Sequence, residues 1–142
     1  MGKVKIDLPE HFLYKTELTV RVSDLNYGGH LGNDAVLRLV HEARIRFLKS
    51  EDHTEFDVYG AGLIQSDAVI VYKSEAFHGD KIEVSVALSD FTNAACDFYY
   101  LLTHQPSGKE VARAKTRIVF YDYRHRKKLP VPAAFLEKFQ NS

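Results

Sequence analysis

The segment from Ser23 to Asp34, SDLNYGGHLGND, carries the densest group of chemically capable side chains in the sequence. It combines carboxylates, an amide, an imidazole and glycines in one short stretch. Glycine lets a backbone approach a ligand closely, and a helix that begins after such a loop presents N–H groups without acceptors and a partial positive charge. We therefore expect this segment to be able to bind an oxyanion or to polarise a carbonyl group.

The same segment is also compatible with a structural turn. Its Asp and Asn side chains could do no more than accept hydrogen bonds from backbone N–H groups. Asn33 and Asp34 are the predicted N-cap candidates of the helix that follows. The residues alone leave both interpretations open.

Other catalytic patterns are absent from the sequence. There is no G-x-S-x-G nucleophile elbow, and His41-Glu42 does not begin a zinc-protease motif, because Ile45 stands where the second histidine belongs. The seven histidines are dispersed along the chain, so we predict no metal site. Cys96 is the single cysteine, which excludes an intrachain disulfide and a thiolate zinc cage.

The composition is that of an ordinary globular protein. The 142 residues suit one domain, residues 1–142, because single cores usually span roughly 100 to 200 residues. Lys plus Arg and Asp plus Glu both total 19, so no net charge favours nucleic acid or an anionic membrane as partner. The chain starts without an apolar stretch typical of a signal peptide, and no later run is long enough for membrane insertion. We expect a cytoplasmic protein.

The spacing of apolar residues predicts one strand, one long helix and then four strands. The helix is predicted over 33–50, where apolar residues recur every three or four positions. The first strand is predicted over 18–22, and the later strands over 63–76, 81–89, 93–104 and 110–121. Short turns separate the later strands. This order favours an α+β fold in which an antiparallel sheet curls around the helix.

The element order and the loop together resemble the hotdog superfamily, especially its branch of 4-hydroxybenzoyl-CoA and acyl-ACP thioesterases. Acyl-ACP thioesterases carry a loop similar to S-D-L-D-x-N-x-H-V-N-N, followed by a helix with a glutamate. The matching residues are Ser23, Asp24, Leu25, His30, Asn33 and Glu42. Glu42 also lies in the segment HEAR, which is similar to the E-A-R segment of bacterial acyl-CoA thioesterases. The stretch from Val119 to Pro132 is similar to the last strand and tail of the family.

This resemblance implies a hotdog fold and the hydrolysis of acyl-CoA or acyl-ACP. It implies a homodimer or a tetramer with sites built from two chains, and no cofactor beyond the coenzyme A or acyl carrier protein of the substrate. Glu42 is the expected base, acting across the interface, while Asn26 and His30 orient the water or the carbonyl. The residues expected to hold the substrate are Tyr27, Gly28, Gly29, Leu31, Gly32 and Asn33.

The loop departs from the family pattern at Asn26, where most relatives have an aspartate that acts as nucleophile or base. An amide cannot take up a proton. Catalysis therefore depends on Glu42, Asp24 or His30, or else the protein binds acyl thioesters without hydrolysing them. A third alternative is an enoyl-CoA hydratase or dehydratase. The D-x-N-x-x-H loop of that family is similar to Asp24 to His30, where the spacing is longer by one residue and Tyr27 replaces a proline.

The basic run Arg124 to Lys128, RHRKK, is a second candidate for substrate binding. Arg126, Lys127 and Lys128 could bind the phosphates of coenzyme A or the acidic surface of a carrier protein. A solvated turn is the alternative.

Overall fold

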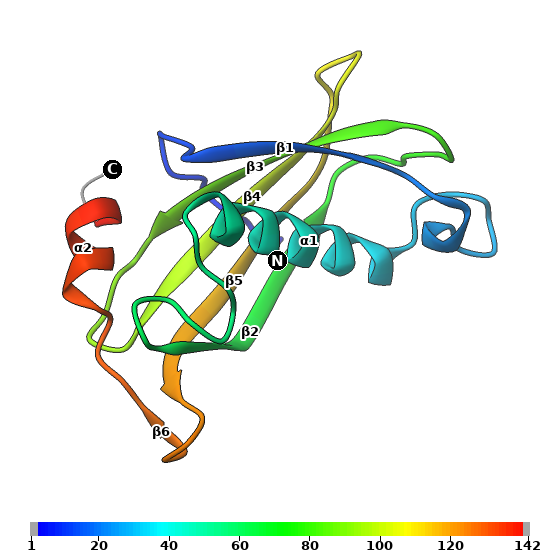
Figure 1. The fold of residues 1–142 in the computed structure, drawn as a ribbon. Coiled ribbons are helices and arrows are strands. Elements are labelled where there is room, and N and C mark those ends of the chain that lie inside the picture. Colours follow the sequence, from blue (N-terminus) through cyan, green and yellow to red (C-terminus); the bar gives the residue numbers. More distant parts are fainter. Residues whose placement is uncertain (1–2, 141–142) are drawn as a thin grey trace.

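The computed structural model describes residues 3–140. Six strands form one antiparallel sheet in this part of the chain, five of them in the order β1-β3-β4-β5-β2, with β6 paired to β5 (Figure 1). The strands are β1 (Tyr14–Thr19), β2 (Gly62–Tyr72), β3 (Lys81–Ser89), β4 (Ala95–His104), β5 (Glu110–Asp122) and β6 (Lys127–Lys128). The two α-helices of the described residues are α1 (Asn33–Ser50) and α2 (Ala133–Phe139), and neither is long and apolar enough to cross a membrane.

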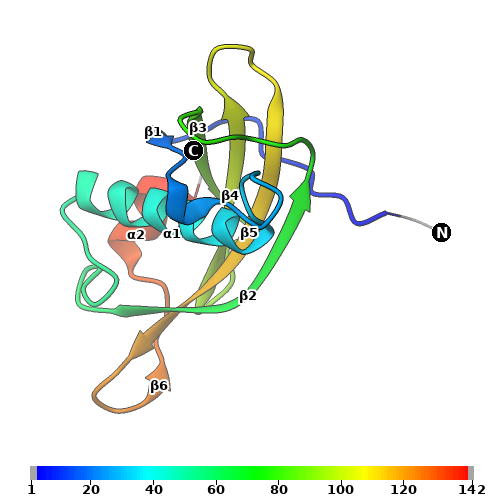
Figure 2. The ribbon, with the colours of Figure 1, turned by 90° about the vertical axis from the view of Figure 1, so that its right-hand side faces the viewer.

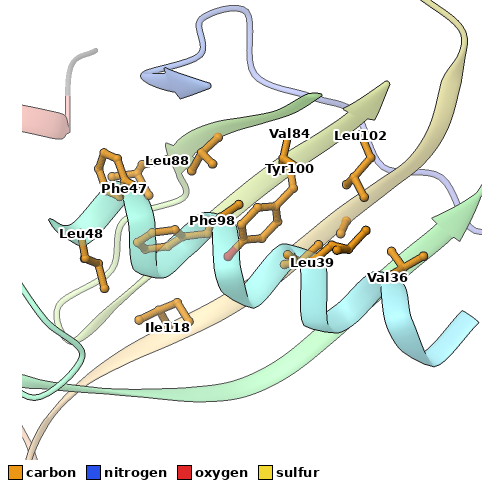
Figure 3. Packing of buried hydrophobic residues seen from close by; sticks show 14 of the residues in the cluster. Val36, Leu39, Phe47, Leu48, Val84, Leu88, Phe98, Tyr100, Leu102 and Ile118 are labelled. Carbon is orange, nitrogen blue, oxygen red and sulfur yellow. The ribbon is translucent and has the colours of Figure 1, made fainter. Parts of the chain in front are cut away.

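Helix α1 lies against the sheet, which curls around it (Figures 1 and 3). Its ends agree with the predicted range 33–50. The buried residues of the helix are Ala35, Val36, Leu39, Val40, Ala43, Arg44, Phe47 and Leu48. The apolar ones share a core with strand residues such as Val84, Phe98 and Ile118 (Figure 3). Burying one such side chain stabilises the fold by about 1.5–3 kcal/mol. The predicted sheet wrapped around one long helix is confirmed.

The N-terminal segment covers part of the opposite face of the sheet (Figure 2). Its side chains Ile6, Leu8 and Phe12 pack against Ala87 and Tyr99. Strand β4 is therefore buried on both faces along most of its length. The sequence of a strand that is covered on both faces is a nearly continuous apolar run, without the alternation of apolar and polar residues.

The first strand lies earlier in the chain than predicted. It spans Tyr14–Thr19 instead of 18–22, and Val22 belongs to a short 3-10 turn, Val22–Asp24. The turn forms because the Asp24 carboxylate accepts a hydrogen bond from the N–H of Arg21 at 2.8 Å. Such local side-chain to backbone bonds compete with strand pairing.

The start of α1 also differs from the prediction. Its N-cap is Gly32, no side chain caps it, and Asn33 and Asp34 are already helical. The first N–H groups of the helix consequently lack the side-chain acceptor that an Asn or Asp cap supplies.

The C-terminal elements β6 and α2 were not predicted, and β2 ends at Tyr72 instead of Ala76. Helix α2 is too short to show a helical period in the sequence. Its Phe135 and Phe139 are buried, and their rings contact Phe120 and Phe47 at centroid distances of 5.3 and 5.6 Å. Tertiary packing thus holds α2 in place.

Strands β1 and β2 form the two edges of the sheet. Within the described residues, β2 pairs with β5 alone, so its other side carries unpaired backbone groups. Two surface hollows border this strand, one near Leu63 at its beginning and the other near Tyr72 at its end. An unpaired edge of this kind is a template for pairing with another strand.

Candidate functional site

Asn26 fixes the shape of the glycine-rich loop. Its Oδ1 accepts hydrogen bonds from the N–H groups of Gly28 at 2.9 Å and His30 at 3.2 Å. Its own N–H donates to the carbonyl oxygen of His30 at 2.8 Å, and its carbonyl oxygen accepts from Gly29 N–H at 3.1 Å. Tyr27 lies at the fully exposed tip of this turn. The amide that stands in place of the family's aspartate therefore holds the loop closed.

The N–H groups of Gly28 to Gly32 are all engaged within the chain. Leu31 N–H donates to Ala76 O at 2.8 Å and Gly32 N–H to Asp24 O at 2.9 Å, in addition to the three bonds around Asn26. The oxyanion donors expected between Gly28 and Gly32 are thus already used. Among the described residues, the N–H groups of Asn33 and Asp34 at the start of α1 have no acceptor. These two groups are free donors at the end of the loop.

Asp24 is a buried, ionised carboxylate below the loop. Its oxygens accept hydrogen bonds from Arg21 Nε at 3.3 Å and Arg21 Nη2 at 3.2 Å, and Arg38 Nη2 lies 3.8 Å from Oδ1. Burial opposes ionisation, but the hydrogen bonds from Arg21 and the charges of both arginines outweigh it and hold the pKa of Asp24 below its usual range. Asp24 is placed to hold the loop to the start of α1.

His30 and Asn33 line a hollow of about 310 Å³ between the loop and the end of β2, which we call the loop hollow. Its lining residues are Asn26, His30, Leu31, Asn33, Val36, Tyr72, Lys73, Ser74, Glu75 and Val111. His30 Nδ1 lies 3.2 Å from Glu75 Oε1, and the Tyr72 hydroxyl donates to Asn33 O at 3.0 Å. Of the site residues predicted from the sequence, the structure thus brings Asn26, His30 and Asn33 together at one hollow.

Glu42 lies on the other side of α1, toward β1. It lines a separate hollow of about 640 Å³ with Glu17, Arg21 and Arg46. Its Oε2 accepts a hydrogen bond from Arg46 Nε at 2.8 Å, and Arg46 Nη1 also donates to Thr16 Oγ1 at 2.8 Å. Its role as the base stays a prediction, and in this structure its side chain is part of an ion pair on the helix surface.

A third hollow lies between α1 and the beginning of β2, and the sequence analysis did not identify it. This edge hollow has a volume of about 480 Å³ and is lined by Asp34, Leu37, Arg38, His41, Arg44, Glu55, Leu63, Ile64, Gln65 and Tyr123. At its base, the buried Arg44 donates to Glu55 Oε2 at 3.1 Å, to Gln65 Oε1 at 3.1 Å and to the Tyr100 hydroxyl at 3.2 Å. The burial of Arg44 could have been predicted from the sequence. Arg44 comes four residues after the apolar Val40, so the two residues lie on the same face of the helix.

His41 and Glu55 form a hydrogen-bonded pair at the rim of the edge hollow. His41 Nε2 lies 2.7 Å from Glu55 Oε1. Burial opposes ionisation of Glu55, but the hydrogen bond with His41 and the charge of Arg44 outweigh it and lower its pKa. Glu55 is therefore an ionised carboxylate bound to a histidine on one side and to an arginine on the other.

The basic residues Arg126, Lys127 and Lys128 are exposed on the hairpin between β5 and β6, which projects from the body of the molecule (Figure 1). Asp122 shapes this hairpin, because its Oδ1 accepts hydrogen bonds from the N–H groups of Arg124 and His125 at 2.9 and 3.0 Å. Among residues 3–140, no acidic residue forms an ion pair with Arg126, Lys127 or Lys128, so these charges face solvent. Within residues 3–140, no group of three or more His, Cys, Asp or Glu side chains is placed to hold a metal ion.

The chain has clear similarity to known thioesterases. A family model described as the thioesterase-like superfamily matches residues 20–139. The 1,4-dihydroxy-2-naphthoyl-CoA thioesterase from Synechocystis is 25% identical, with a TM-score of 0.76 over 84% of this chain and 89% of that chain. A thioesterase-superfamily protein from Jannaschia has a TM-score of 0.81 at 19% identity, over 92% of this chain and 83% of that chain. A comparison with curated proteins finds no match.

Proposed function

Because this chain belongs to the thioesterase-like superfamily, we propose that it hydrolyses an acyl thioester, carried by coenzyme A or by an acyl carrier protein, to the free acid and the thiol. The observation that supports this proposal most strongly is the pair of N–H groups of Asn33 and Asp34, which lack acceptors within the described chain. Asn33 also lines the loop hollow. A thioester carbonyl placed there would accept hydrogen bonds from the helix start.

The proposed chemistry begins with the carbonyl oxygen of the substrate at the start of α1. Backbone N–H donors of this kind stabilise the tetrahedral oxyanion, and each is worth about 3–4 kcal/mol in related acyl-transfer reactions. Asn26 holds the loop closed through its Oδ1, which leaves the Nδ2 donors to orient the water or the carbonyl. His30 lines the same hollow and is available for the same task.

The active unit is proposed to be a homodimer or a tetramer of paired chains. In an antiparallel pairing of two β2 strands about a two-fold axis, the Leu63 end of one strand lies opposite the Tyr72 end of the other. Leu63 lines the edge hollow and Tyr72 the loop hollow. Such pairing therefore places the edge hollow of one chain beside the loop hollow of its partner.

We expect light scattering at micromolar concentration to give a mass of twice or four times 16.2 kDa. Ser66→Pro in the middle of the open edge should lower this mass toward that of the monomer, because proline removes a backbone donor from the strand. Ser89→Pro is the control for loss of fold, because Ser89 is at the end of β3, which is not an edge strand. The melting temperatures of the two variants are compared with that of the wild type. A wild-type protein that scatters as a monomer would contradict the dimer.

The basic hairpin is proposed to attract the phosphates of the substrate. Replacing Arg126, Lys127 and Lys128 by glutamine should raise KM for an acyl-CoA several-fold and leave kcat nearly unchanged, because this attraction is the same in the ground and transition states. The effect should disappear at high salt. Glutamine at Lys3 and Lys5, which are exposed elsewhere, provides the matched control. An unchanged KM at low salt would support the solvated turn.

The proposed function is tested by incubating the protein with a panel of saturated, aromatic and enoyl-CoA substrates and the matching acyl carrier proteins. Release of free thiol supports hydrolysis, and the carrier that is cleaved faster identifies the substrate class. A hydrated product without thiol release would instead identify a hydratase. Binding in calorimetry without turnover of any substrate would identify a non-catalytic acyl-thioester-binding protein.

A further inference from the structure

We propose that His41, held by Glu55, is the general base that activates the water for thioester hydrolysis. This inference rests on the proposed function and adds to it the residue that takes the proton. Asn26 cannot take a proton, and Glu42 is bound to Arg46 on the β1 side of the helix. His41 is next to Glu42 in the chain, and it lines both the hollow beside Glu42 and the edge hollow. Consecutive helical residues point about 100° apart, so the two side chains leave the helix in different directions.

The hydrogen bond to Glu55 selects the tautomer of His41 that a base requires. Because the pKa of Glu55 is lowered, its carboxylate is ionised and can only accept a hydrogen bond. Nε2 of His41, 2.7 Å away, must then carry the proton. In the neutral imidazole Nδ1 is left with a free lone pair, and Nδ1 has no partner among the described residues.

The support of Glu55 is rigid. Arg44 is 4% exposed in its side chain and binds Glu55 Oε2 at 3.1 Å, while its Nη1 also donates to Gln65 of β2 and to the Tyr100 hydroxyl of β4. Tyr100 is in turn 2.9 Å from Thr116 Oγ1 in the buried core. The carboxylate is thus anchored through a buried arginine to the middle of the sheet, which fixes the orientation of the imidazole.

His41 is also accessible to substrate. Its side chain is 53% exposed, whereas that of Glu55 is 24% exposed. It lies on a helix, whose backbone is fixed by the packing of α1 on the sheet. In the β2 pairing proposed above, the water at His41 lies beside the loop hollow of the partner chain, where the thioester carbonyl is held.

In the proposed reaction, water adds to the thioester carbonyl and the thiol then leaves. Nδ1 of His41 accepts a proton from water while the water oxygen forms a bond to the thioester carbonyl carbon, and the carbonyl electron pair moves to the oxygen. The oxyanion then re-forms the C=O bond, the C–S bond breaks, and the sulfur takes the electron pair. The leaving thiolate accepts the proton from Nδ1. The net reaction consumes one water and yields the carboxylic acid and the thiol, and it restores the neutral imidazole.

Charged groups lie on both sides of His41. The titratable and charged groups that line the two hollows beside it are Glu17, Arg21, Asp34, Arg38, Glu42, Arg44, Arg46, Glu55 and Tyr123. Of these, Glu55 is the one hydrogen-bonded to the imidazole. Removing its charge should therefore move the acid limb of the kcat/KM profile to lower pH, because the imidazolium loses its hydrogen-bonded counter-charge.

The test uses the protein of residues 1–142 and the acyl thioester that the wild type hydrolyses fastest. His41→Gln keeps a donor for Glu55 but has no basic nitrogen, and we expect kcat to fall by about 10² or more with KM changed much less. Hydroxylamine, which attacks without a base, should still cleave the bound substrate. His11→Gln is the matched control, because His11 also lies beside a glutamate but is 76% exposed on the N-terminal segment.

Three further results decide the proposal. Glu55→Gln should lower kcat and move the acid limb of kcat/KM to lower pH, whereas an unmoved limb overturns the role of Glu55 even if His41→Gln fails to fold. Near-wild-type kcat in His41→Gln, or an equal loss in His11→Gln, overturns the role of His41. A loss confined to Glu42→Gln returns the base to the glutamate predicted from the sequence. If the wild type cleaves no thioester at all, it is the proposed function that fails.

Discussion

Replacing Asn33 by proline is expected to lower kcat by about 10²–10³ while leaving the fold and KM nearly unchanged. Proline removes the N–H of residue 33, which has no acceptor within the described chain, together with the exposed amide side chain. The first position of a helix tolerates proline well. The preceding Gly32 has φ −70 and ψ 150, the extended conformation that a residue before proline prefers. Steady-state kinetics together with the melting temperature measure the effect.

Asn33→Ala is the matched variant for this experiment. It keeps the backbone N–H and removes the exposed side chain, so its kcat should stay within about tenfold of the wild type, the loss typical of one neutral hydrogen bond. An Asn33→Pro protein that folds normally and keeps full kcat would show that the oxyanion is held elsewhere. Equal losses in the two variants would assign the effect to the amide side chain instead of the backbone.

Replacing Arg44 by methionine is expected to reduce the free energy of unfolding by about 3–5 kcal/mol at pH 7. Arg44 is buried and binds Glu55, Gln65 and Tyr100. Methionine fills a similar length without a charge, so the largely buried carboxylate of Glu55 loses its counter-charge. Urea unfolding followed by circular dichroism measures the difference between the two proteins.

The pH dependence of this difference has a definite sign. The pKa of Glu55 is lower in the folded wild type than in the unfolded chain, so its ion pair stabilises the fold above the unfolded value of about 4.3 and is lost as pH falls through the folded pKa. The difference between wild type and Arg44→Met should therefore narrow in acid. Arg46→Met on the same helix is the control, and loss of its exposed pair with Glu42 should cost only about 0.3–0.5 kcal/mol. If the difference in the free energy of unfolding between wild type and Arg44→Met became larger below about pH 4, this would contradict the role of Glu55.

The sequence by itself determined the elements whose side chains repeat with a regular period. Helix α1 spans the predicted range 33–50, and strand β3 agrees with the predicted 81–89. Periodicity succeeds here because one face of each element is buried along its whole length, and burial selects apolar residues at each turn or at every second residue. The loop from Ser23 to Asp34 was proposed as a candidate site from the sequence, because glycines, amides and a histidine just before a helix are an unusual local combination, and its role stays a prediction.

The hydrogen bonds within the loop could be established only from the three-dimensional structure. An asparagine in a glycine-rich loop can bind a ligand or close a turn, and the composition is the same in both cases. In the structure, Asn26 Oδ1 accepts hydrogen bonds from the N–H groups of Gly28 and His30. The structure also shows that the helix starts on Gly32 without a side-chain cap, which leaves the N–H groups of Asn33 and Asp34 without acceptors.

The tertiary structure alone decided which side chains meet at the edge hollow. His41 and Glu55 are separated in sequence by the end of α1 and the turn after it, and Tyr100 lies on β4, yet Arg44 connects Glu55 to Tyr100. No local pattern encodes such contacts, because they depend on where the chain returns after the helix. The sheet order, which puts β2 at an edge beside β5, likewise arises from pairing between distant strands. That order brings the edge hollow and the loop hollow to the same open strand.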